Sequence, residues 1–562
     1  MKRFFGWMVL LLTVANLTDL VRAQVSGGTI TGTVTDVSGS LLAHAQVTIT
    51  NRDTDVVRSL AVNQDGYYSA PNLVPGRYQV MAAMPGFGSK AVNVTLTVGD
   101  DLKVDLSLEI GSVDQRVVVT DAPPTVELSS SALSAVVNGD AIRDLPLNGR
   151  SWTDLAILQP GVAGVQTQVA FNQGAGRGNR GFGAQMSISG GRPQQNNYRL
   201  DGVSINDYAN GGPGSVLGIN LGVDAIEEFS VITSNYSAEY GRTSGGVVNA
   251  TTRSGTNNFH GNAYEFIRNS ALDTRNYFDA AKIPPFKRNQ FGASAGGPIW
   301  RDHTFIFGDY ESIRQSLGTT NQVVTPSALA RTGVLYTSSG ATQTVAVDPT
   351  VQKYLALFPV PNKPIAANAN SGTYVFTNEQ VVNENFFTIR TDHKLSEADS
   401  AFGTYLYDDA PFTQSDADNN VLQGSHTRRQ DLILEENHIF GSKFINTVRF
   451  GLNRQAIENN QSVTAINPAA SDLSLGVLPG RSAAGINVPG LDRMVGGVGS
   501  SPTYLFRYTT FQGYDDAFLT LGQHSLKFGL AFERLQNNIL ALSNPSGLFN
   551  FADLAHFLTN SP

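Results

Sequence analysis

The sequence contains no cysteine and few charged residues. Its 562 residues include 39 Lys+Arg and 47 Asp+Glu, a charged fraction of 15%, against roughly 25% in ordinary soluble domains. Without cysteine, disulfide scaffolds, cysteine-ligated zinc sites and thiol nucleophiles are excluded. The net charge of -8 and the lack of basic runs argue against a nucleic-acid-binding protein. Glycine is abundant, at 56 residues, but shows no period of three, which excludes collagen.

The N-terminus has the pattern of an export signal. Lys2 and Arg3 precede the apolar run Phe4–Ala15, and small residues follow at the positions that a signal peptidase reads. We predict a signal peptide at residues 1–23, cleaved after Ala23. A membrane anchor is the alternative, but polar residues from Asn16 onward leave the run short of the ~20 residues that span a bilayer. No later stretch reaches that length.

Residues 27–112 are predicted to form a small β-sandwich. Period-two alternation around Ile30–Val34 is followed by further strands at Ala45–Thr50, Arg77–Ala82 and Lys103–Leu108, with Asp-Gly and Pro-Gly turns between them. The segments at 32–36, 45–51, 65–68 and 73–78 resemble the carboxypeptidase regulatory-like domain. That family has an immunoglobulin-like fold sometimes grouped with carbohydrate-binding folds. Because no cluster of exposed aromatics is evident, we expect a spacer or docking module.

Residues 113–135 form a predicted linker. A β-branched run, Val117–Thr120, ends at Asp121 before two prolines. An extended segment of this kind suits β-augmentation, in which a partner pairs with it through main-chain hydrogen bonds. Taken alone, the segment is better explained as a further strand of the sandwich or as a passive tether.

Residues 136–255 are rich in Gly, Asn and Arg and predict a small α+β unit. We expect helices at Asp140–Leu145, Trp152–Leu158 and Asp224–Phe229. A hairpin is expected where Asn197–Leu200 meets the Asp201-Gly202 turn. Strands are expected at Phe229–Thr233 and Gly246–Thr252.

From residue 256 onward, successive segments alternate apolar and polar side chains. In His524–Arg534, for example, Leu526, Phe528, Leu530 and Phe532 share one face. A transmembrane β-barrel shows this pattern because one face of each strand meets lipid and the other meets a watery lumen. A large soluble sandwich gives the same signal, since period two does not distinguish lipid from a protein core.

Several ordered motifs resemble the TonB-dependent receptor superfamily, in its Oar-like, acidobacterial branch. The clearest runs from Asn235 through Tyr240-Gly241-Arg242, Gly245-Gly246 and Asn249 to Phe266, and is similar to the end of that family's plug and its entry into the barrel. Three shorter matches support it: Leu147-Asn148-Gly149-Arg150, Ser189-Gly190-Gly191-Arg192 with Leu200-Asp201-Gly202, and Gly292–Pro298.

The resemblance implies an outer-membrane transporter or receptor that is mainly β: an immunoglobulin-like sandwich, an α+β plug at 136–255 and an antiparallel barrel from residue 256. It implies that Val117, Val118, Val119, Thr120 and Asp121 form a TonB box, captured by a TonB-type energy-coupling protein. The ligand stays open among siderophores, oligosaccharides, vitamins and peptides. A surface adhesion protein that recognises carbohydrate is the competing hypothesis.

Plug arginines are candidates to pair with lumen carboxylates or to hold an anionic ligand; they are Arg150, Arg177, Arg180, Arg192 and Arg242. Pairing is the commoner case in such settings.

The strand count departs from the family pattern. We count nine or ten strands after His260, whereas the family has 22, so residues 256–562 predict the N-terminal part of a barrel. An open half-barrel would leave an unpaired edge in lipid. We therefore expect a fragment of a longer protein or a truncated, non-functional product.

No cofactor, metal or catalytic set is predicted. The eight histidines are scattered and no Ser-His-Asp arrangement emerges, so we do not expect an enzyme. Glu435, Glu436 and His438 are expected in a polar lumen wall, and Asp408, Asp409, Asp416 and Asp418 in an exposed acidic loop.

Overall fold

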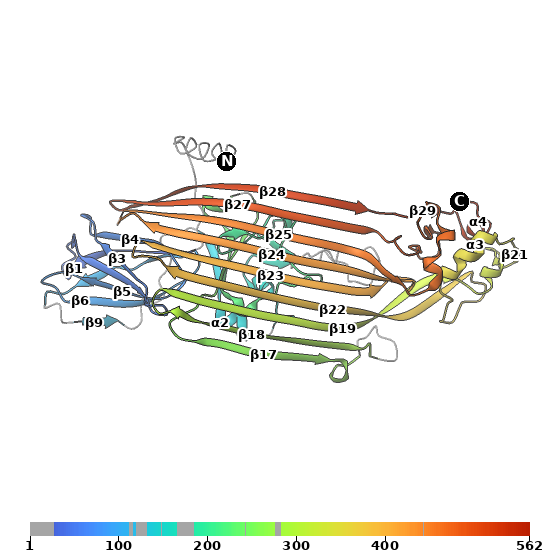
Figure 1. Cartoon of the computed structure of the whole chain (residues 1–562), viewed down its shortest axis with the longest axis horizontal. Coiled ribbons are helices and arrows are strands. Elements are labelled where there is room, and N and C mark those ends of the chain that lie inside the picture. The colour runs from blue at the N-terminus through green and yellow to red at the C-terminus, as the bar shows by residue number, and fades with distance from the viewer. Residues whose placement is uncertain are drawn as a thin grey trace, which may run out of the picture.

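The computed structural model describes residues 27–562 except 112–115, 120–131, 146, 148, 166–184, 242, 276–282 and 442. The expected signal peptide and its cleavage site lie outside the described residues. The chain folds into a sandwich, a small α+β unit and a long nine-stranded sheet (Figure 1). In the described part of the chain, no helix has both the length and the apolar character needed to cross a membrane.

The N-terminal body is the expected β-sandwich. One sheet has the order β4-β1-β7, with β8 also paired to β1, and the other has the order β3-β2-β5-β6-β9. Alternating side chains such as Ile30, Val47, Val80 and Leu106 point inward and form a closed apolar core. The strands are β1 (Gly28–Asp36), β2 (Gln46–Asn51), β3 (Val57–Ala61), β4 (Tyr67–Leu73), β5 (Gly76–Ala83), β6 (Ser89–Leu96), β7 (Asp101–Lys103), β8 (Leu106–Leu108) and β9 (Arg116–Val119).

The second body is built on a mixed sheet with the order β10-β15-β16-β13-β14. Its strands are β10 (Leu133–Asn138), β13 (Asn197–Leu200), β14 (Val203–Ser204), β15 (Ile226–Ser234) and β16 (Val247–Thr252), with the small pair β11 (Val162–Gly164) and β12 (Met186–Ile188). Helical segments are α2 (Gly139–Asp144), η1 (Trp152–Leu158), η3 (Pro193–Gln195), η4 (Val223–Ala225) and η5 (Ala238–Tyr240).

The helix expected at Asp224–Phe229 is wrong. Only a short 3-10 turn, η4, is helical there, and β15 begins at Ile226. The β-branched residues Val231 and Ile232 favour a strand, and β15 is paired on both sides, with β10 and β16. Tertiary pairing therefore overrides the acidic, helix-compatible local sequence.

The third body is one antiparallel sheet with the order β17-β18-β19-β22-β23-β24-β25-β27-β28. Its nine strands match the predicted count, although many are far longer than the ten residues expected. They are β17 (His260–Asn269), β18 (Phe286–Trp300), β19 (Thr304–Pro326), β22 (Ser371–Lys394), β23 (Asp399–Ser415), β24 (Val421–Ile439), β25 (Phe444–Ala465), β27 (Thr503–Leu521) and β28 (His524–Leu542). Among the described residues β17 and β28 do not pair with each other, so the sheet is a curved wall with two edges.

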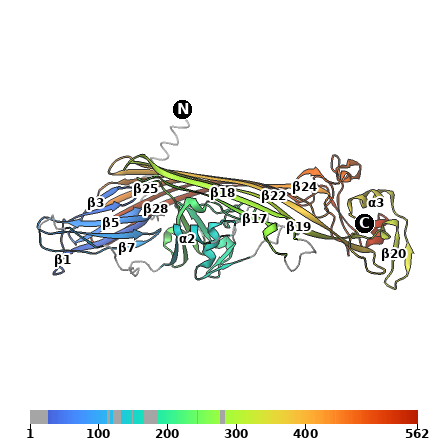
Figure 2. The same cartoon turned by 90° about the horizontal axis from the view of Figure 1, so that it is seen from below.

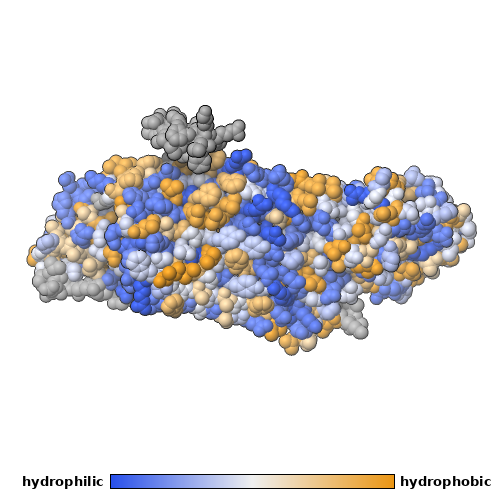
Figure 3. Space-filling view, in the orientation of Figure 1, coloured by the Kyte–Doolittle hydropathy of each residue, from blue (hydrophilic) through white to orange (hydrophobic). Residues whose placement is uncertain are grey.

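The wall carries its polar side chains inside and its apolar side chains outside. In β25, Thr447 and Arg449 are buried, while the alternate residues Val448 and Phe450 are 47% and 41% exposed. The same alternation places Phe387 and Ile389 of β22, Leu434 of β24 and Phe511 of β27 on the exposed face. Apolar side chains are visible on this surface in Figure 3. A soluble sandwich would have the reverse arrangement, so this observation removes the ambiguity that period two leaves.

The two ends of the wall differ in their connections. At one end, hereafter the short-turn end, neighbouring strands are joined by two to four residues, as at 301–303, 395–398, 440–443 and 522–523. At the other, the long-loop end, segments 327–370, 466–502 and 543–562 fold into a body with its own apolar core. That body contains η7 (Ala330–Thr332), β20 (Val334–Tyr336), β21 (Thr342–Thr344), α3 (Pro349–Tyr354), η8 (Leu355–Leu357), η9 (Pro468–Ser471), η10 (Leu473–Leu475), β26 (Gly485–Asn487), β29 (Leu548–Asn550) and α4 (Leu554–Leu558); η6 (Ser270–Leu272) follows β17.

The α+β unit lies in the concavity of the wall, and the sandwich lies at the short-turn end (Figure 2). The apolar core of the α+β unit is continuous with the inner face of the wall: Trp152, Phe229 and Leu200 share one cluster with Phe386 and Ile433. The concave face is thus filled by a separate, earlier segment of the chain.

Candidate functional site

Arg150 joins the α+β unit to the wall. Gly149 and Arg150 both have positive φ, 93° and 52°, a conformation that glycine adopts readily and other residues rarely. This turn directs the buried Arg150 guanidinium between two carboxylates. Its Nη2 lies 2.5 Å from Asp224 Oδ2, and its Nε lies 3.2 Å from Glu311 Oε1 on β19. Burial alone would lower the pKa of Arg150, but Glu311, Tyr264 and Asp224 together outweigh burial, and the net pKa is raised.

The Asp201-Gly202 turn makes the second junction. It closes the expected β13–β14 hairpin, with φ of 46° and 78°. The Asp201 carboxylate accepts hydrogen bonds from Thr252 N and from Thr404 Oγ1 on β23, at 2.9 Å each. Arg390 Nη1 of β22 lies 3.3 Å from Asp201 Oδ1. A plug turn is therefore fixed by two wall strands.

Gly202 allows a wall arginine to approach the backbone. A Cβ at this position would lie 2.6 Å from Arg449 Nη1. Arg449 is fully buried and pairs with Glu435 at 2.6 Å, and it lies 3.6 Å from Asp516. The conformation and the close contact both explain why this motif carries glycine.

The remaining motif residues support the internal structure of the unit. Ser189 and Gly190 form a turn with φ of 50° and 78°. A Cβ at position 246 would lie 2.2 Å from Ile188, and a Cβ at position 245 would be similarly close to Gln195, so both positions require glycine. These glycines let the start of β16 pass against the β12 turn.

The predicted arginines and polar motif residues have different fates. Arg150 pairs with carboxylates, as predicted, whereas Arg192 is exposed. Asn249 is fully buried in β16, and in the described structure neither its amide oxygen nor its nitrogen has a hydrogen-bond partner. Tyr240 is buried, with Arg199 5.8 Å from its ring, and Gly241 follows it in a turn. Asn148, Arg177, Arg180 and Arg242 lie outside the described residues.

The candidate TonB box is partly described. Val117, Val118 and Val119 belong to β9, which pairs in parallel with β6 of the sandwich, so that Lys90 is opposite Val117. In this structure the run is an edge strand of the sandwich, as the alternative interpretation expected. Thr120 and Asp121 lie outside the described residues.

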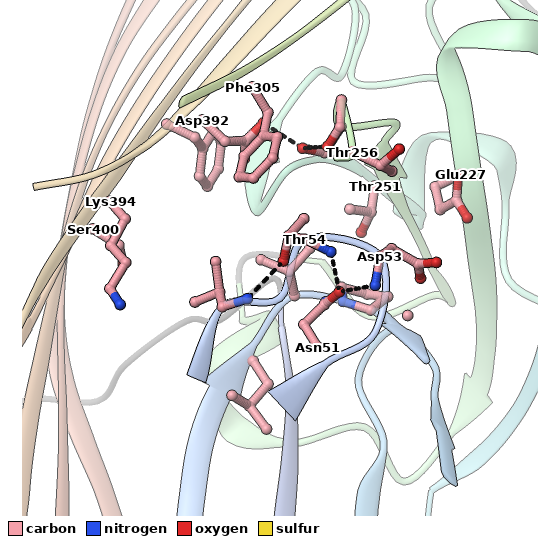
Figure 4. Close-up of a pocket in the computed structure, with 18 of the residues that line it drawn as sticks. Asn51, Asp53, Thr54, Glu227, Thr251, Thr256, Phe305, Asp392, Lys394 and Ser400 are labelled. Carbon is pink, nitrogen blue, oxygen red and sulfur yellow. Dashed lines mark hydrogen bonds between the residues drawn. The ribbon is translucent and has the colours of Figure 1, made fainter. Parts of the chain in front are cut away.

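A cavity of about 730 Å³ lies where the sandwich, the α+β unit and the short-turn end of the wall meet. Figure 4 shows Asp53 and Thr54 of the sandwich between Lys394 of the wall on one side and Thr251 of the α+β unit on the other. Next to it, the Val98 N–H of the sandwich donates to the Glu228 carboxylate. Burial raises the pKa of Glu228 to about 8, against its usual 4.5.

Two expectations about acidic residues need correction. Glu435 lies on the lumen face as expected, but Glu436 and His438 alternate with the buried Glu435 and Asn437 and so point to the outer face. There the two residues approach Asp399, whose Oδ1 lies 2.5 Å from His438 Nδ1. The four aspartates at 408, 409, 416 and 418 do not form an exposed loop, because Asp408, Asp416 and Asp418 are buried.

Sequence reasoning missed the wall partners of these motifs, which are Glu311, Arg390, Arg449 and Glu435. Each lies on the polar face of a strand whose side chains alternate between polar and apolar. That alternation was the sequence signal that could have placed these residues on the lumen face. Pairing each with a plug residue required the three-dimensional register, because the partners are separated by up to 247 positions in sequence, as from Gly202 to Arg449.

Comparison with known proteins identifies the class of this fold. Residues 251–562 match the family described as an outer membrane beta barrel domain, residues 125–248 match the TonB-dependent receptor plug domain, and residues 29–109 match the carboxypeptidase regulatory-like domain. The chain therefore belongs to the TonB-dependent outer-membrane receptors, which are transporters and receptors and not enzymes.

Individual relatives resemble the chain over part of their length. The chain is 30% identical over 301 residues to the TonB-dependent transporter Oar of Myxococcus xanthus, covering 51% of this chain and 27% of the relative. Among solved structures, it is similar to the outer membrane transporter YddB of Escherichia coli, with 13% identity and a TM-score of 0.46, covering 72% of this chain and 48% of that one. The chain thus spans about a quarter of the one relative's length and about half of the other's.

Proposed function

We propose that this protein is a TonB-dependent transporter that moves a ligand through a plugged β-barrel, using energy supplied by a periplasm-spanning TonB-type partner. The observation that carries the proposal is the combination of an apolar outer face with a polar lumen filled by the plug. The outer face suits lipid. The plug is attached to the lumen by Arg150 and Asp201, so ligand passage requires it to rearrange.

The connections orient the wall. Outer-membrane barrels have short periplasmic turns and long extracellular loops, so the sandwich and β9 would face the periplasm and the long-loop body would face outward. This orientation supports energy coupling at β9. It argues against the adhesion hypothesis in its original form, because it places the regulatory-like sandwich away from the cell surface. The long-loop body remains available for ligand contact.

The partner-binding segment is proposed to be Val117–Asp121. As the last strand in the order β3-β2-β5-β6-β9, β9 has one edge without a paired strand in the described structure. Such an edge can accept a further strand through main-chain hydrogen bonds. Export through a signal peptide cleaved after Ala23 is part of the same proposal. The ligand class stays open among siderophores, oligosaccharides, vitamins and peptides.

A spanning wall also needs partners for its edges. Unpaired backbone groups in lipid cost several kcal/mol each, so β17 and β28 must both be paired in the membrane. An immunoblot of native cell fractions against the sandwich, with and without boiling, tests this. We expect an outer-membrane band whose mobility shifts on heating; a soluble periplasmic band without a shift would contradict the transporter proposal.

Energy coupling is tested without knowledge of the ligand. A photo-crosslinking amino acid at position 118 of the native protein should give a covalent adduct with an inner-membrane-anchored partner in living cells. Val118→Pro combined with a crosslinker at 117 should abolish the adduct, because proline removes a backbone donor. A crosslinker at the exposed position 37 serves as control. If position 118 yields no adduct, or if position 37 yields the same one, the segment is not a TonB box.

A further inference from the structure

The sandwich contacts the wall at points spread across its width. Asn257, before β17, donates through Nδ2 to Thr54 O of the sandwich at 2.9 Å and to Asp302 Oδ1 of the β18–β19 turn at 2.7 Å. At the other side, Asn63 Nδ2 donates to Gly522 O of the β27–β28 turn at 2.7 Å. These contacts tie the sandwich to turns near both edges of the sheet.

A third contact enters the lumen at β24 and β25, between the two edges of the wall. Asn72 has a positive φ of 53° and is buried. Its Nδ2 donates to Thr447 Oγ1 of β25 at 3.0 Å and lies 3.4 Å from Glu435 Oε1 of β24. These are the same strands whose Arg449 meets the plug turn at Gly202. The tip of the sandwich therefore reaches the polar network that holds the plug.

The cavity lies behind these contacts. Its walls come from all three bodies, with Asp53 and Arg77 from the sandwich, Glu227 and Arg253 from the plug, and Asp392 and Lys394 from the wall. Its volume, about 730 Å³, is within the range of ordinary small-molecule sites, roughly 300–1,000 Å³. The chamber thus has room for a small solute between the plug and the sandwich at the short-turn end.

The contacts that hold the sandwich against the wall are polar, unlike the contacts that hold the plug there. Among the residues that the structure describes, the sandwich core contains no plug or wall residue, whereas the plug core includes Phe386 and Ile433 of the wall. Interfaces held by a few hydrogen bonds allow relative domain motion, while large apolar interfaces oppose it. The contacts at the mouth can thus be broken without unfolding either body.

We propose that the N-terminal sandwich is a gate that closes the periplasmic mouth of the plugged lumen through Asn63, Asn72 and Asn257, and that it must move to release solute from the chamber behind it. The role of the gate in releasing solute rests on the proposed transport function. Its closed position rests only on the contacts described above. Because β9 belongs to the sandwich sheet, a pull on the TonB-box segment acts directly on the gate.

The absence of cysteine from the chain makes single-cysteine reporters clean. Thr251 lines the chamber and is 4% exposed, and its hydroxyl has no hydrogen-bond partner in the described structure, so Thr251→Cys removes no bond. Val37, 66% exposed on the sandwich, gives the accessible control, Val37→Cys. Ala156, fully buried in the plug core, reports unfolding as Ala156→Cys.

The probe is fluorescein maleimide, applied to the full chain in native outer membranes. We expect Thr251→Cys to react at least tenfold more slowly than Val37→Cys. Replacing all three gate asparagines by alanine should raise the rate at position 251 on the order of tenfold or more, since their side-chain hydrogen bonds between the sandwich and the wall are all lost. Asn93→Ala, which removes the acceptor of a Gln79 side-chain hydrogen bond within the sandwich, should leave the rate unchanged, and Ala156→Cys should stay unreactive in every background.

Two results would overturn the gate: equal labelling at 251 and 37 with the asparagines intact, or no effect of the triple substitution. Neither measurement needs a ligand or an energy source. Repeating it in living cells with and without a protonophore tests coupling separately. A protected position 251 whose labelling ignores the protonophore would contradict energy-driven transport while leaving the closed mouth in place.

Discussion

The plug and the sandwich both lie against the same wall, but they are held by different forces. The plug shares an apolar core with the wall and adds buried Arg–carboxylate contacts at Arg150 and Asp201. In the described structure, the apolar core of the sandwich consists of sandwich residues alone. The sandwich contacts its neighbours through asparagine amides and through Glu228. Contacts of the first kind oppose movement of the plug as a whole, whereas contacts of the second kind allow the sandwich to move as a rigid body.

The largest expected effect is at Arg150. Arg150→Ala leaves the buried Asp224 and Glu311 without their counter-charge, which costs about 3–5 kcal/mol in comparable buried pairs. Urea unfolding of the purified chain, followed by Trp152 fluorescence in a background with Trp7→Phe and Trp300→Phe, measures the loss of stability in the plug. The control is Arg143→Ala, whose partner Asp140 is 85% exposed and whose removal should cost about 0–1 kcal/mol. Equal effects of the two substitutions would refute the role given to Arg150.

The next effect separates the two cores. Leu106 is buried in the sandwich core, and Leu106→Ala should destabilise the sandwich by about 2–5 kcal/mol. Hydrogen exchange should quicken in residues 28–108 and stay unchanged in β15 and β16 of the plug. The exposed Val37→Ala should change stability by no more than about 0.5 kcal/mol. Faster exchange in the plug would mean that the two cores are coupled, against the comparison above.

The contact at Glu228 makes the junction pH-dependent. Its pKa is about 8 in the folded protein against 4.5 in the free group, so between these values the folded state holds a proton that the unfolded state has lost. Stability therefore falls as pH rises from 4.5 to 8, by up to about 1.4 kcal/mol per unit, and levels off above 8.

Glu228→Gln keeps an oxygen acceptor for Val98 N–H and should remove that slope. Its stability should match the parent near pH 4.5 and exceed it near pH 8, measured by urea unfolding at a series of pH values. Glu227→Gln, at a neighbouring side chain that is 45% exposed, should keep the slope. A slope that survives Glu228→Gln would assign the dependence to another group.

Sequence alone identified the three bodies, the strand number and the hairpin at Asp201-Gly202, because these follow from local periodicity and turn chemistry. It misassigned Asp224–Phe229 as a helix, because local acidity says nothing about pairing on both sides of β15. It placed Glu436 in the lumen wall, because adjacent residues of a strand face opposite ways and the phase was not resolved. The contacts between the sandwich and the wall were not predictable, since Asn72 and Thr447 meet only once both bodies are folded. The domain boundaries and the TonB-box residues stay predictions.

The smallest expected effect compares two motif glycines with the same backbone conformation. Gly190 and Gly202 both have φ of 78°, so alanine at either position pays the left-handed cost of about 1–2 kcal/mol. A Cβ at Gly190 meets no atom within 4 Å, whereas one at Gly202 must displace Arg449, which is paired with Glu435. Gly202→Ala should therefore lower the free energy of unfolding by about 1 kcal/mol or more beyond the loss caused by Gly190→Ala, measured by the same Trp152 unfolding curve. Because backbone strain cancels in the difference, the excess measures how tightly the plug turn is held against the wall. Equal losses of stability for the two substitutions would mean that Arg449 moves aside without cost. The plug turn would then be held against the wall no more tightly than the sandwich is.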